Sequence, residues 1–158
     1  MTNNVPAPAL SVVFVDRDSE TYLMEGVKKN GWHVIAFKGG GSLESFFSAA
    51  RYSLPLDYPI SGKVSWDALD DSLSGGLIDI NAECAIVWAD ADELLQKDPK
   101  AFGMCVQFWS DVEYGLELQR RDRRTNAALR SFLLGKGPQF LGLDTADLVR
   151  RQTGPSGQ

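Results

Sequence analysis

Three short apolar runs, separated from one another by segments with helical spacing, constrain the fold of this chain most. They cover residues 33–37, 84–88 and 130–134. A run of five residues has the length of a β-strand, and strands that alternate with helices form parallel sheets, because a helical crossover returns the chain to the same end of the sheet. The 158 residues are enough for one domain with a sizeable core. We therefore predict an α/β fold in which these three segments lie in one small parallel sheet packed by helices.

The N-terminal residues contain the signals of one further β-α unit. Residues 11–15 are a strand candidate, and residues 19–29 are a helix candidate. This strand would enlarge the sheet, although a hairpin or a loose arm are alternatives. We expect a single domain over residues 1–153 with residues 1–32 as an N-terminal extension. Residues 145–152 are predicted to form a last helix, and residues 154–158 a disordered tail.

Residues 65–76 are predicted to form a short helix with an acidic outer face. Ser65 is a suitable N-cap and Gly75 a suitable residue past the helix end. The outer face is expected to carry Asp67, Asp70, Asp71 and Ser74. On so short a helix Asp70 and Asp71 lie toward the negative end of the helix dipole, and each is one turn from Asp67, so the charges oppose folding. We interpret this face as a surface for a cation, and a solvated acidic face is the alternative.

The run from Ser65 to Leu73 resembles the asparagine-tryptophan-aspartate-alanine, x-x-aspartate-x-leucine signature of the barstar family, intracellular inhibitors of secreted ribonucleases. The order of the elements from His33 to Leu134 resembles that family as well. The resemblance implies a barstar-like fold and an inhibitory surface that includes an acidic residue on a later helix, where Asp111 falls. We predict that the partner-binding residues are the outer-face residues together with two others: Asp67, Asp70, Asp71, Ser74, Gly75 and Asp111.

Some positions depart from the family pattern. Ser65 replaces the usual asparagine, Asp70 stands at a variable position that is often aromatic or asparagine, and Gly76 stands where some relatives carry an aromatic residue. The loop after Tyr58 is longer than the family spacing, so this tyrosine is not matched to a binding residue. The resemblance therefore implies a generic acidic inhibitor surface and does not identify the nuclease.

The distribution of charge supports a basic partner. Residues 1–117 hold 8 Lys and Arg against 18 Asp and Glu, whereas residues 118–158 hold 8 against 3. An acidic surface attracts a basic protein and repels nucleic acid. We interpret the arginine-rich segment 120–124 as a solvated linker and not as a nucleic-acid site. No apolar stretch approaches the length of a membrane span and no signal run is visible, so we expect a cytoplasmic protein. Cys84 and Cys105 have apolar neighbours and are predicted to be reduced core residues.

Several features could instead support an enzyme, and each has a simpler explanation. Asp16 and Asp18 faintly resemble the nucleophile motif of haloacid dehalogenase-type phosphatases, but no paired-aspartate motif follows. The three glycines at residues 39–41 lack the spacing of a phosphate-binding loop. The acidic residues at positions 90, 92 and 93 are predicted to cap a short helix and not to bind a metal. The single histidine, His33, has no nucleophile or carboxylate assigned to it.

These observations predict a stoichiometric protein inhibitor of a basic ribonuclease or related nuclease toxin, with no catalytic residue, metal or cofactor and no contact with nucleic acid or membrane. Its carboxylates would occupy the positions at which the nuclease holds phosphates. The alternatives are a non-catalytic regulatory module that binds another basic protein and a phosphatase-like enzyme that uses Asp16 and Asp18.

Overall fold

The structure is a computed structural model that describes residues 12–144 and residue 148. Its elements in chain order are β1 (Val13–Asp16), the 3₁₀ helix η1 (Arg17–Ser19), α1 (Glu20–Lys29), β2 (His33–Phe37), α2 (Leu43–Ser53), α3 (Trp66–Ile80), β3 (Glu83–Trp88), α4 (Ala91–Lys97), α5 (Pro99–Arg121), β4 (Ala128–Gly135) and α6 (Pro138–Leu141). The predicted helix at residues 145–152 and the predicted tail lie outside the described part of the chain, apart from Leu148.

The strands form one four-stranded parallel sheet in the order β1-β4-β3-β2. The three segments predicted to share a sheet are β2, β3 and β4, so that prediction is confirmed. The N-terminal strand β1 joins the sheet at the free edge of β4, with Val15 paired to Leu134. The sheet therefore has one strand more than the smallest version that we predicted.

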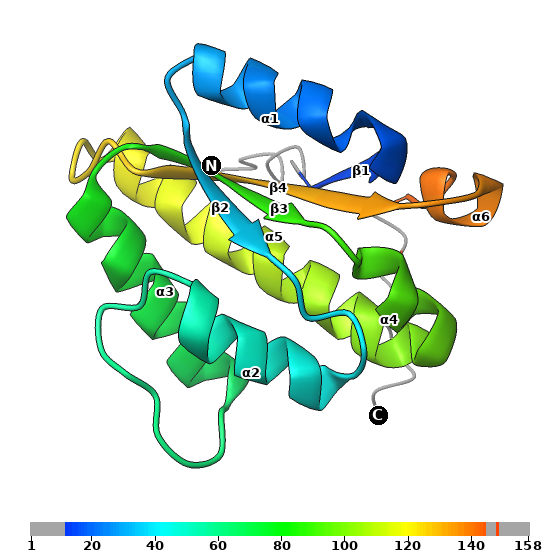
Figure 1. Cartoon of the computed structure of the whole chain (residues 1–158). Helices are drawn as coiled ribbons and strands as arrows, with labels where there is room; N and C mark the ends of the chain where they lie inside the picture. Colours follow the sequence, from blue (N-terminus) through cyan, green and yellow to red (C-terminus); the bar gives the residue numbers. More distant parts are fainter. Residues whose placement is uncertain (1–11, 145–147, 149–158) are drawn as a thin grey trace, which may run out of the picture.

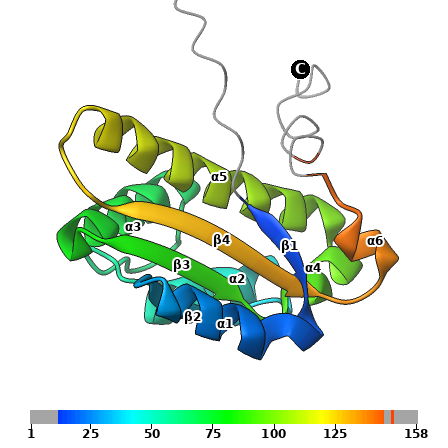
Figure 2. The ribbon, with the colours of Figure 1, turned by 90° about the horizontal axis from the view of Figure 1, so that it is seen from above.

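Helices cover both faces of the sheet unequally. Figures 1 and 2 show α2, α3, α4 and α5 on one face and α1 on the other, over β2. The helix α1 connects β1 at one edge with β2 at the opposite edge and must therefore cross this second face. None of the helices in the described segments is long and apolar enough to cross a membrane.

The main core lies between the sheet and the four helices α2 to α5, and aromatic rings fill its centre. The ring centroid of Phe46 is 5.1 Å from that of Phe37, 5.2 Å from that of Trp88 and 5.7 Å from that of Trp109. Both cysteines are free and buried, as predicted. Burial raises the pKa of Cys84 and Cys105, which keeps both thiols protonated and unreactive.

Side-chain caps start α3 and α5, and the cap of α3 is the Ser65 that the sequence predicted. The hydroxyl of Ser65 accepts a hydrogen bond from the backbone N–H of Ala68 at 3.1 Å, and the carboxylate of Asp98 accepts one from Ala101 at 3.1 Å. These bonds satisfy backbone donors that a helix cannot pair internally. The starts of α3 and α5 are fixed by local chemistry, and so are the directions in which their side chains project.

The acidic residues after β3 do not cap α4 with their side chains, which corrects the prediction. Asp90 accepts hydrogen bonds from the backbone of Gly39 at 3.1 Å and from the indole nitrogen of Trp88 at 3.0 Å. Asp92 is buried and forms an ion pair with Arg17, which follows β1. Its second oxygen accepts from the backbone N–H of Lys136 at 3.1 Å. These carboxylates connect neighbouring strand ends, so their role is structural.

The two aspartates of the Asp-x-Asp motif at the end of β1 also have interactions at these strand ends. Asp16 accepts a hydrogen bond from the backbone N–H of Asp18 at 2.9 Å. The carboxylate of Asp18 in turn lies 2.6 Å from the ammonium group of Lys136. Both carboxylates therefore have structural partners at the junction of β1 and β4.

Candidate functional site

The acidic helix is longer than predicted. Helix α3 continues to Ile80 and ends at Asn81, which adopts the left-handed conformation with φ of 56°. Gly75 therefore lies inside the helix, and the prediction that it follows the last helical residue is wrong. Asp70 and Asp71 consequently lie in the first half of α3, away from its negative end. The dipole argument does not apply to them, whereas the repulsion among neighbouring carboxylates still does.

The two glycines of α3 are explained by a segment that crosses the helix. A Cβ atom on Gly76 would overlap the carbonyl oxygen of Pro55, and one on Gly75 would lie 2.6 Å from a carboxylate oxygen of Asp57. Glycine is required here for close approach of the backbone and not for a helix end. The segment before Tyr58 can therefore lie directly against α3.

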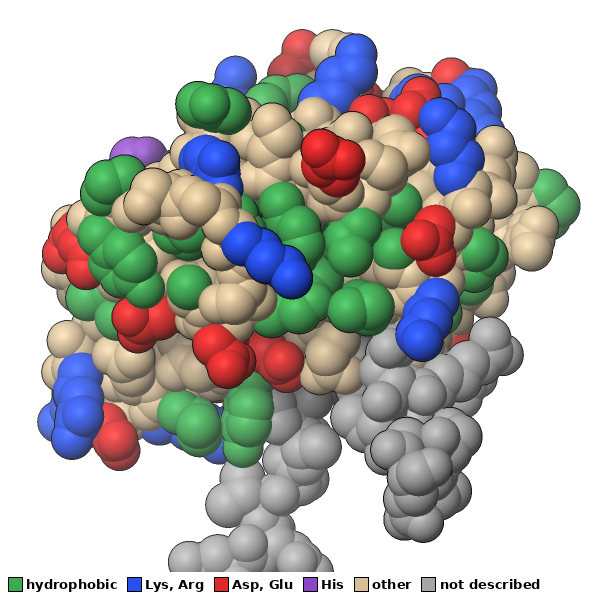
Figure 3. Space-filling view, turned by 90° about the horizontal axis from the view of Figure 1, so that it is seen from below, with side chains coloured by type: hydrophobic (Ala, Val, Ile, Leu, Met, Phe, Trp, Pro, Cys, Tyr) green, Lys and Arg blue, Asp and Glu red, His purple; other side chains and the backbone are tan. Residues whose placement is uncertain are grey.

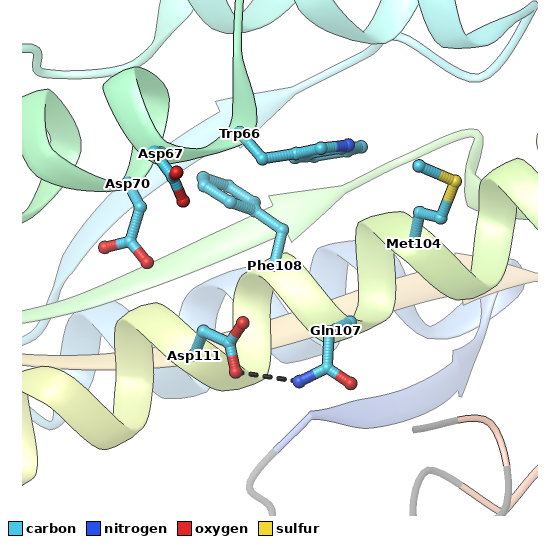
Figure 4. Close-up of a pocket in the computed structure, with 7 residues that line it drawn as sticks. All are labelled: Trp66, Asp67, Asp70, Met104, Gln107, Phe108 and Asp111. Atoms are coloured by element: carbon cyan, nitrogen blue, oxygen red, sulfur yellow. Dashed lines mark hydrogen bonds between the residues drawn. The ribbon is translucent and has the colours of Figure 1, made fainter. Parts of the chain in front are cut away.

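Three of the predicted carboxylates surround one hollow between α3 and α5, which we call the acidic hollow. Asp67 and Asp70 come from α3 and Asp111 from α5, and the hollow has a volume of 260 Å³. Figure 4 shows these side chains with the aromatic rings of Trp66 and Phe108, whose centroids are 5.5 Å apart. The remaining lining residues are Met104 and Gln107. Among the described residues, no lysine or arginine lines the hollow, so their net charge there is negative, and the two aromatic rings make its floor apolar.

Asp70 is the carboxyl group of the hollow whose pKa is raised by its surroundings. Its carboxyl group is half-buried, and burial raises its pKa, as do the charges of Asp111, Asp67 and Asp71. A hydrogen bond from the Ser74 hydroxyl at 3.0 Å acts in the opposite direction. Asp111 is exposed and accepts a hydrogen bond from Gln107 at 2.7 Å. A cation placed in the hollow would relieve this repulsion. Figure 3 shows this side of the molecule, where acidic side chains border hydrophobic ones.

Asp71 does not line the hollow and instead interacts with Tyr58. The tyrosine hydroxyl lies 3.1 Å from a carboxylate oxygen of Asp71 and 3.2 Å from the carbonyl oxygen of Ala68, and it donates to these acceptors. Desolvation, the hydrogen bond to Asp71 and the charge of that carboxylate raise the pKa of Tyr58. The sequence could not match this tyrosine to a binding residue, and the structure places it beside one of the predicted residues.

Ser72 fastens the tyrosine segment to α3. Its hydroxyl accepts a hydrogen bond from the backbone N–H of Tyr58 at 3.1 Å and donates one to the carbonyl oxygen of Tyr58 at 2.7 Å. The backbone N–H of Asp57 donates to the carbonyl oxygen of Ser72 at 2.8 Å. Asp71 and Tyr58 are thereby held on one continuous surface.

A further pair of carboxyl groups was missed by the sequence. A hydrogen bond between the side chains of Asp57 and Asp79 raises the pKa of Asp57, and the charges of Asp79 and Asp71 add to this effect. Helix α3 thus carries carboxylates on two sides. Gly75, a predicted contact residue, packs against the side chain of Asp57.

Comparison with known proteins identifies the fold that carries this site. A family model described as Barstar (barnase inhibitor) matches residues 32–129, which is more than half of the chain. The chain belongs to the barstar family. The match contains α3, α5 and every residue of the acidic hollow, whereas β1, η1 and α1 precede it. No match was found among curated proteins or among solved structures.

The described residues do not provide a metal centre. None of their His, Cys, Asp and Glu side chains are grouped in threes or more in a way that could hold a metal ion. His33 is exposed on the edge strand β2. The site is therefore best described as a rigid acidic surface with an apolar floor.

Proposed function

We propose that this barstar-family protein is a stoichiometric inhibitor of a basic ribonuclease or related nuclease toxin. Its inhibitory surface consists of the acidic hollow together with Asp71. The observation that carries the proposal is the convergence of Asp67, Asp70 and Asp111 from two helices on one hollow, to which the described part of the chain contributes no cationic side chain. Folding alone gives no reason to gather these charges.

The mechanism that we infer is mimicry of phosphate groups. A ribonuclease active site must collect arginine, lysine and histidine side chains in order to hold the phosphates of RNA. Carboxylates on a rigid scaffold can accept charge-assisted hydrogen bonds from the same groups. The rings of Trp66 and Phe108 can contact the apolar stem or the planar cation of an arginine that enters the hollow. Access of RNA to the active site would then be blocked.

Preorganisation supports this role. The caps of α3 and α5 fix both helices, and Ser72 fixes the segment that carries Tyr58. A surface whose side chains are already ordered loses less conformational entropy when a partner binds. Because barstar-family members inhibit ribonucleases, we also propose an immunity role: the protein would protect the cytoplasm of the cell that makes the nuclease.

A non-catalytic module that binds some other basic protein is the second candidate. The same acidic hollow favours it, because charge complementarity selects a basic surface and not a particular enzyme. The phosphatase-like alternative is not favoured, since Asp16 and Asp18 have structural partners in the described fold.

Titration of ribonuclease activity tests the proposal. Barnase is a suitable probe, and its activity should fall linearly and reach zero at one equivalent of the protein. The double variant Asp67→Ala with Asp111→Ala should leave activity at that ratio. The matched control is Glu25→Ala, which removes an exposed carboxylate from α1 on the opposite face of the sheet. Full activity in an excess of wild-type protein, for barnase and for the basic nucleases of the source organism alike, would favour the second candidate.

A further inference from the structure

An exposed stripe of α5 continues from the acidic hollow. It carries Asp111, Tyr114, Leu118 and Arg121, separated by three, four and three residues. With 3.6 residues per turn these positions fall within an arc of roughly 80° on the helix surface. All four side chains are exposed, and the two apolar ones are 39% and 42% exposed. The apolar pair is small, so the case for an interface depends on its position between two charges of opposite sign.

The stripe is complementary to itself when its direction is reversed. Asp111 lies five positions before residue 116 and Arg121 five positions after it, while Tyr114 and Leu118 lie two positions on either side. If two α5 helices pack antiparallel about a two-fold axis at this level, Asp111 of each copy faces Arg121 of the other. Tyr114 of each copy then faces Leu118 of the other. A two-fold interface repeats every contact, so both the ion pair and the apolar contact occur twice.

In the described part of the chain, only exposed interactions within α5 engage the charged ends of the stripe. Asp111 accepts a hydrogen bond from Gln107 at 2.7 Å. The guanidinium of Arg121 lies 3.6 Å from one carboxylate oxygen of Glu117. The other oxygen of Glu117 accepts a hydrogen bond from Arg120 at 3.3 Å. Exposed pairs of this kind contribute little free energy and are readily rearranged. Complementarity to the helix dipole explains a basic residue in the last turn, but it does not explain the exposed Tyr114 and Leu118 between the two charges.

The sequence interpretation of the arginine-rich segment also changes. Arg120 and Arg121 belong to α5 and are not part of a linker. The helix closes with hydrogen bonds from Arg123 to the Arg120 carbonyl and from Arg124 to the Gln119 carbonyl, and Arg123 has φ of 59°. This is the Schellman arrangement, which holds the end of α5 and therefore the position of Arg121.

We propose that this stripe of α5 is a homodimer interface, at which a second copy of the chain packs antiparallel through Asp111, Tyr114, Leu118 and Arg121. The interface is narrow and its charges are exposed, so association should be weak and sensitive to salt. One consequence rests on the proposed function: because Asp111 also lines the acidic hollow, the dimer and a nuclease complex would exclude each other. The dimer itself does not depend on that function.

Sedimentation velocity of the full chain over a wide concentration range tests the dimer. We expect a dimer in about 50 mM salt that dissociates in about 500 mM salt, where screening is much stronger. Asp111→Arg and Arg121→Asp should each raise the dissociation constant by about tenfold or more, because each places like charges opposite one another. The double variant with both reversals restores opposite charges across the axis and should dimerise like the wild type.

Two further variants keep the outcome clear. Leu118→Glu should dissociate the dimer through the apolar contact. Glu25→Arg makes the same charge reversal on α1 and should leave the dimer unchanged, and thermal melts should show that every variant is folded. A wild-type chain that is monomeric at all concentrations in low salt would overturn the proposal. Single reversals without effect, or a folded double variant that stays monomeric, would also overturn it. None of these results depends on nuclease inhibition, which the activity titration tests separately.

Discussion

Replacing Ser72 with Ala should lower the free energy of unfolding by about 1–3 kcal/mol, because two hydrogen bonds with net contributions of roughly 0.5–1.5 kcal/mol each are lost. The Ser72 side chain is 0% exposed, and its hydroxyl both accepts from the backbone N–H of Tyr58 and donates to the Tyr58 carbonyl. Alanine fits the same space and leaves these two backbone groups without their partner. The cost therefore reports how firmly the tyrosine segment is fastened to α3.

Urea unfolding followed by tryptophan fluorescence measures this effect, and Ser131→Ala is the matched control. Ser131 is also 0% exposed, but its hydroxyl has no hydrogen-bond partner among the described residues. Its removal should change the free energy of unfolding by less than about 0.5 kcal/mol, or increase it, because no bond is lost. Equal losses in the two variants would refute the assignment, since burial alone would then determine the cost.

Two further predictions concern α3 and the hollow. Gly76→Ala should destabilise the fold by about 1–3 kcal/mol through overlap with Pro55, whereas Gly115→Ala in α5 should stabilise it by about 0.5–1 kcal/mol, as denaturant melts can show. A destabilising Gly115→Ala or a harmless Gly76→Ala would contradict the packing described. Asp70→Asn should leave the stability at pH 7 unchanged or raise it by about 0.5 kcal/mol, because the charged form is disfavoured in the folded state. This gain should shrink as the pH falls through the raised pKa of Asp70 toward its ordinary value of 3.8. Melts of the variant and the wild type at several pH values measure the gain. A difference in stability that does not change with pH would contradict the reasoning.

The features that the sequence predicted correctly are those that depend on neighbouring residues. The runs that became β2, β3 and β4 are apolar over the length of a strand and lie between helical patterns, so local spacing was sufficient. The predicted cap Ser65 acts on a backbone group three residues away and is equally local. Family membership could be recognised because the run from Ser65 to Leu73 consists of one helix start and its N-cap, and the segments around it keep their order.

The features that the sequence did not predict depend on segments distant in the chain. A pair of glycines usually marks a helix end, and here it lies inside α3 because Pro55 crosses that helix. The pairing of Asp57 with Asp79 has no periodic signal, since one residue lies in a loop and the other near the end of a helix. Asp92 lies in the first turn of α4, where an acidic residue is ordinary, and only the tertiary fold brings Arg17 to it.

The predicted set of partner-binding residues was divided by the structure into two groups. Asp67, Asp70 and Asp111 share the hollow, whereas Asp71 faces Tyr58 on another side of α3. The helical spacing placed Asp67, Asp70 and Asp71 on one outer face. It could not separate the two groups, because the positions of α5 and of the tyrosine segment decide them. Contact of both groups with a basic ribonuclease is a prediction of the proposed function.

Calorimetric titration of Asp71→Ala with a basic ribonuclease, combined with a thermal melt of the same variant, tests the central claim most directly. We predict that the loss of this carboxylate weakens binding by about 2 kcal/mol or more, roughly 30-fold, which is the size that defines an interface hot spot. Asp67→Ala and Asp111→Ala should show smaller losses, and Glu25→Ala none. The melting temperature of Asp71→Ala should stay level or rise slightly. Removal of a repulsive neighbour of Asp67 offsets the loss of the exposed hydrogen bond from Tyr58, whose hydroxyl can still donate to the Ala68 carbonyl. Unchanged affinity together with a lowered melting temperature would show that the carboxylate serves the fold, and it would contradict the proposed inhibitory surface.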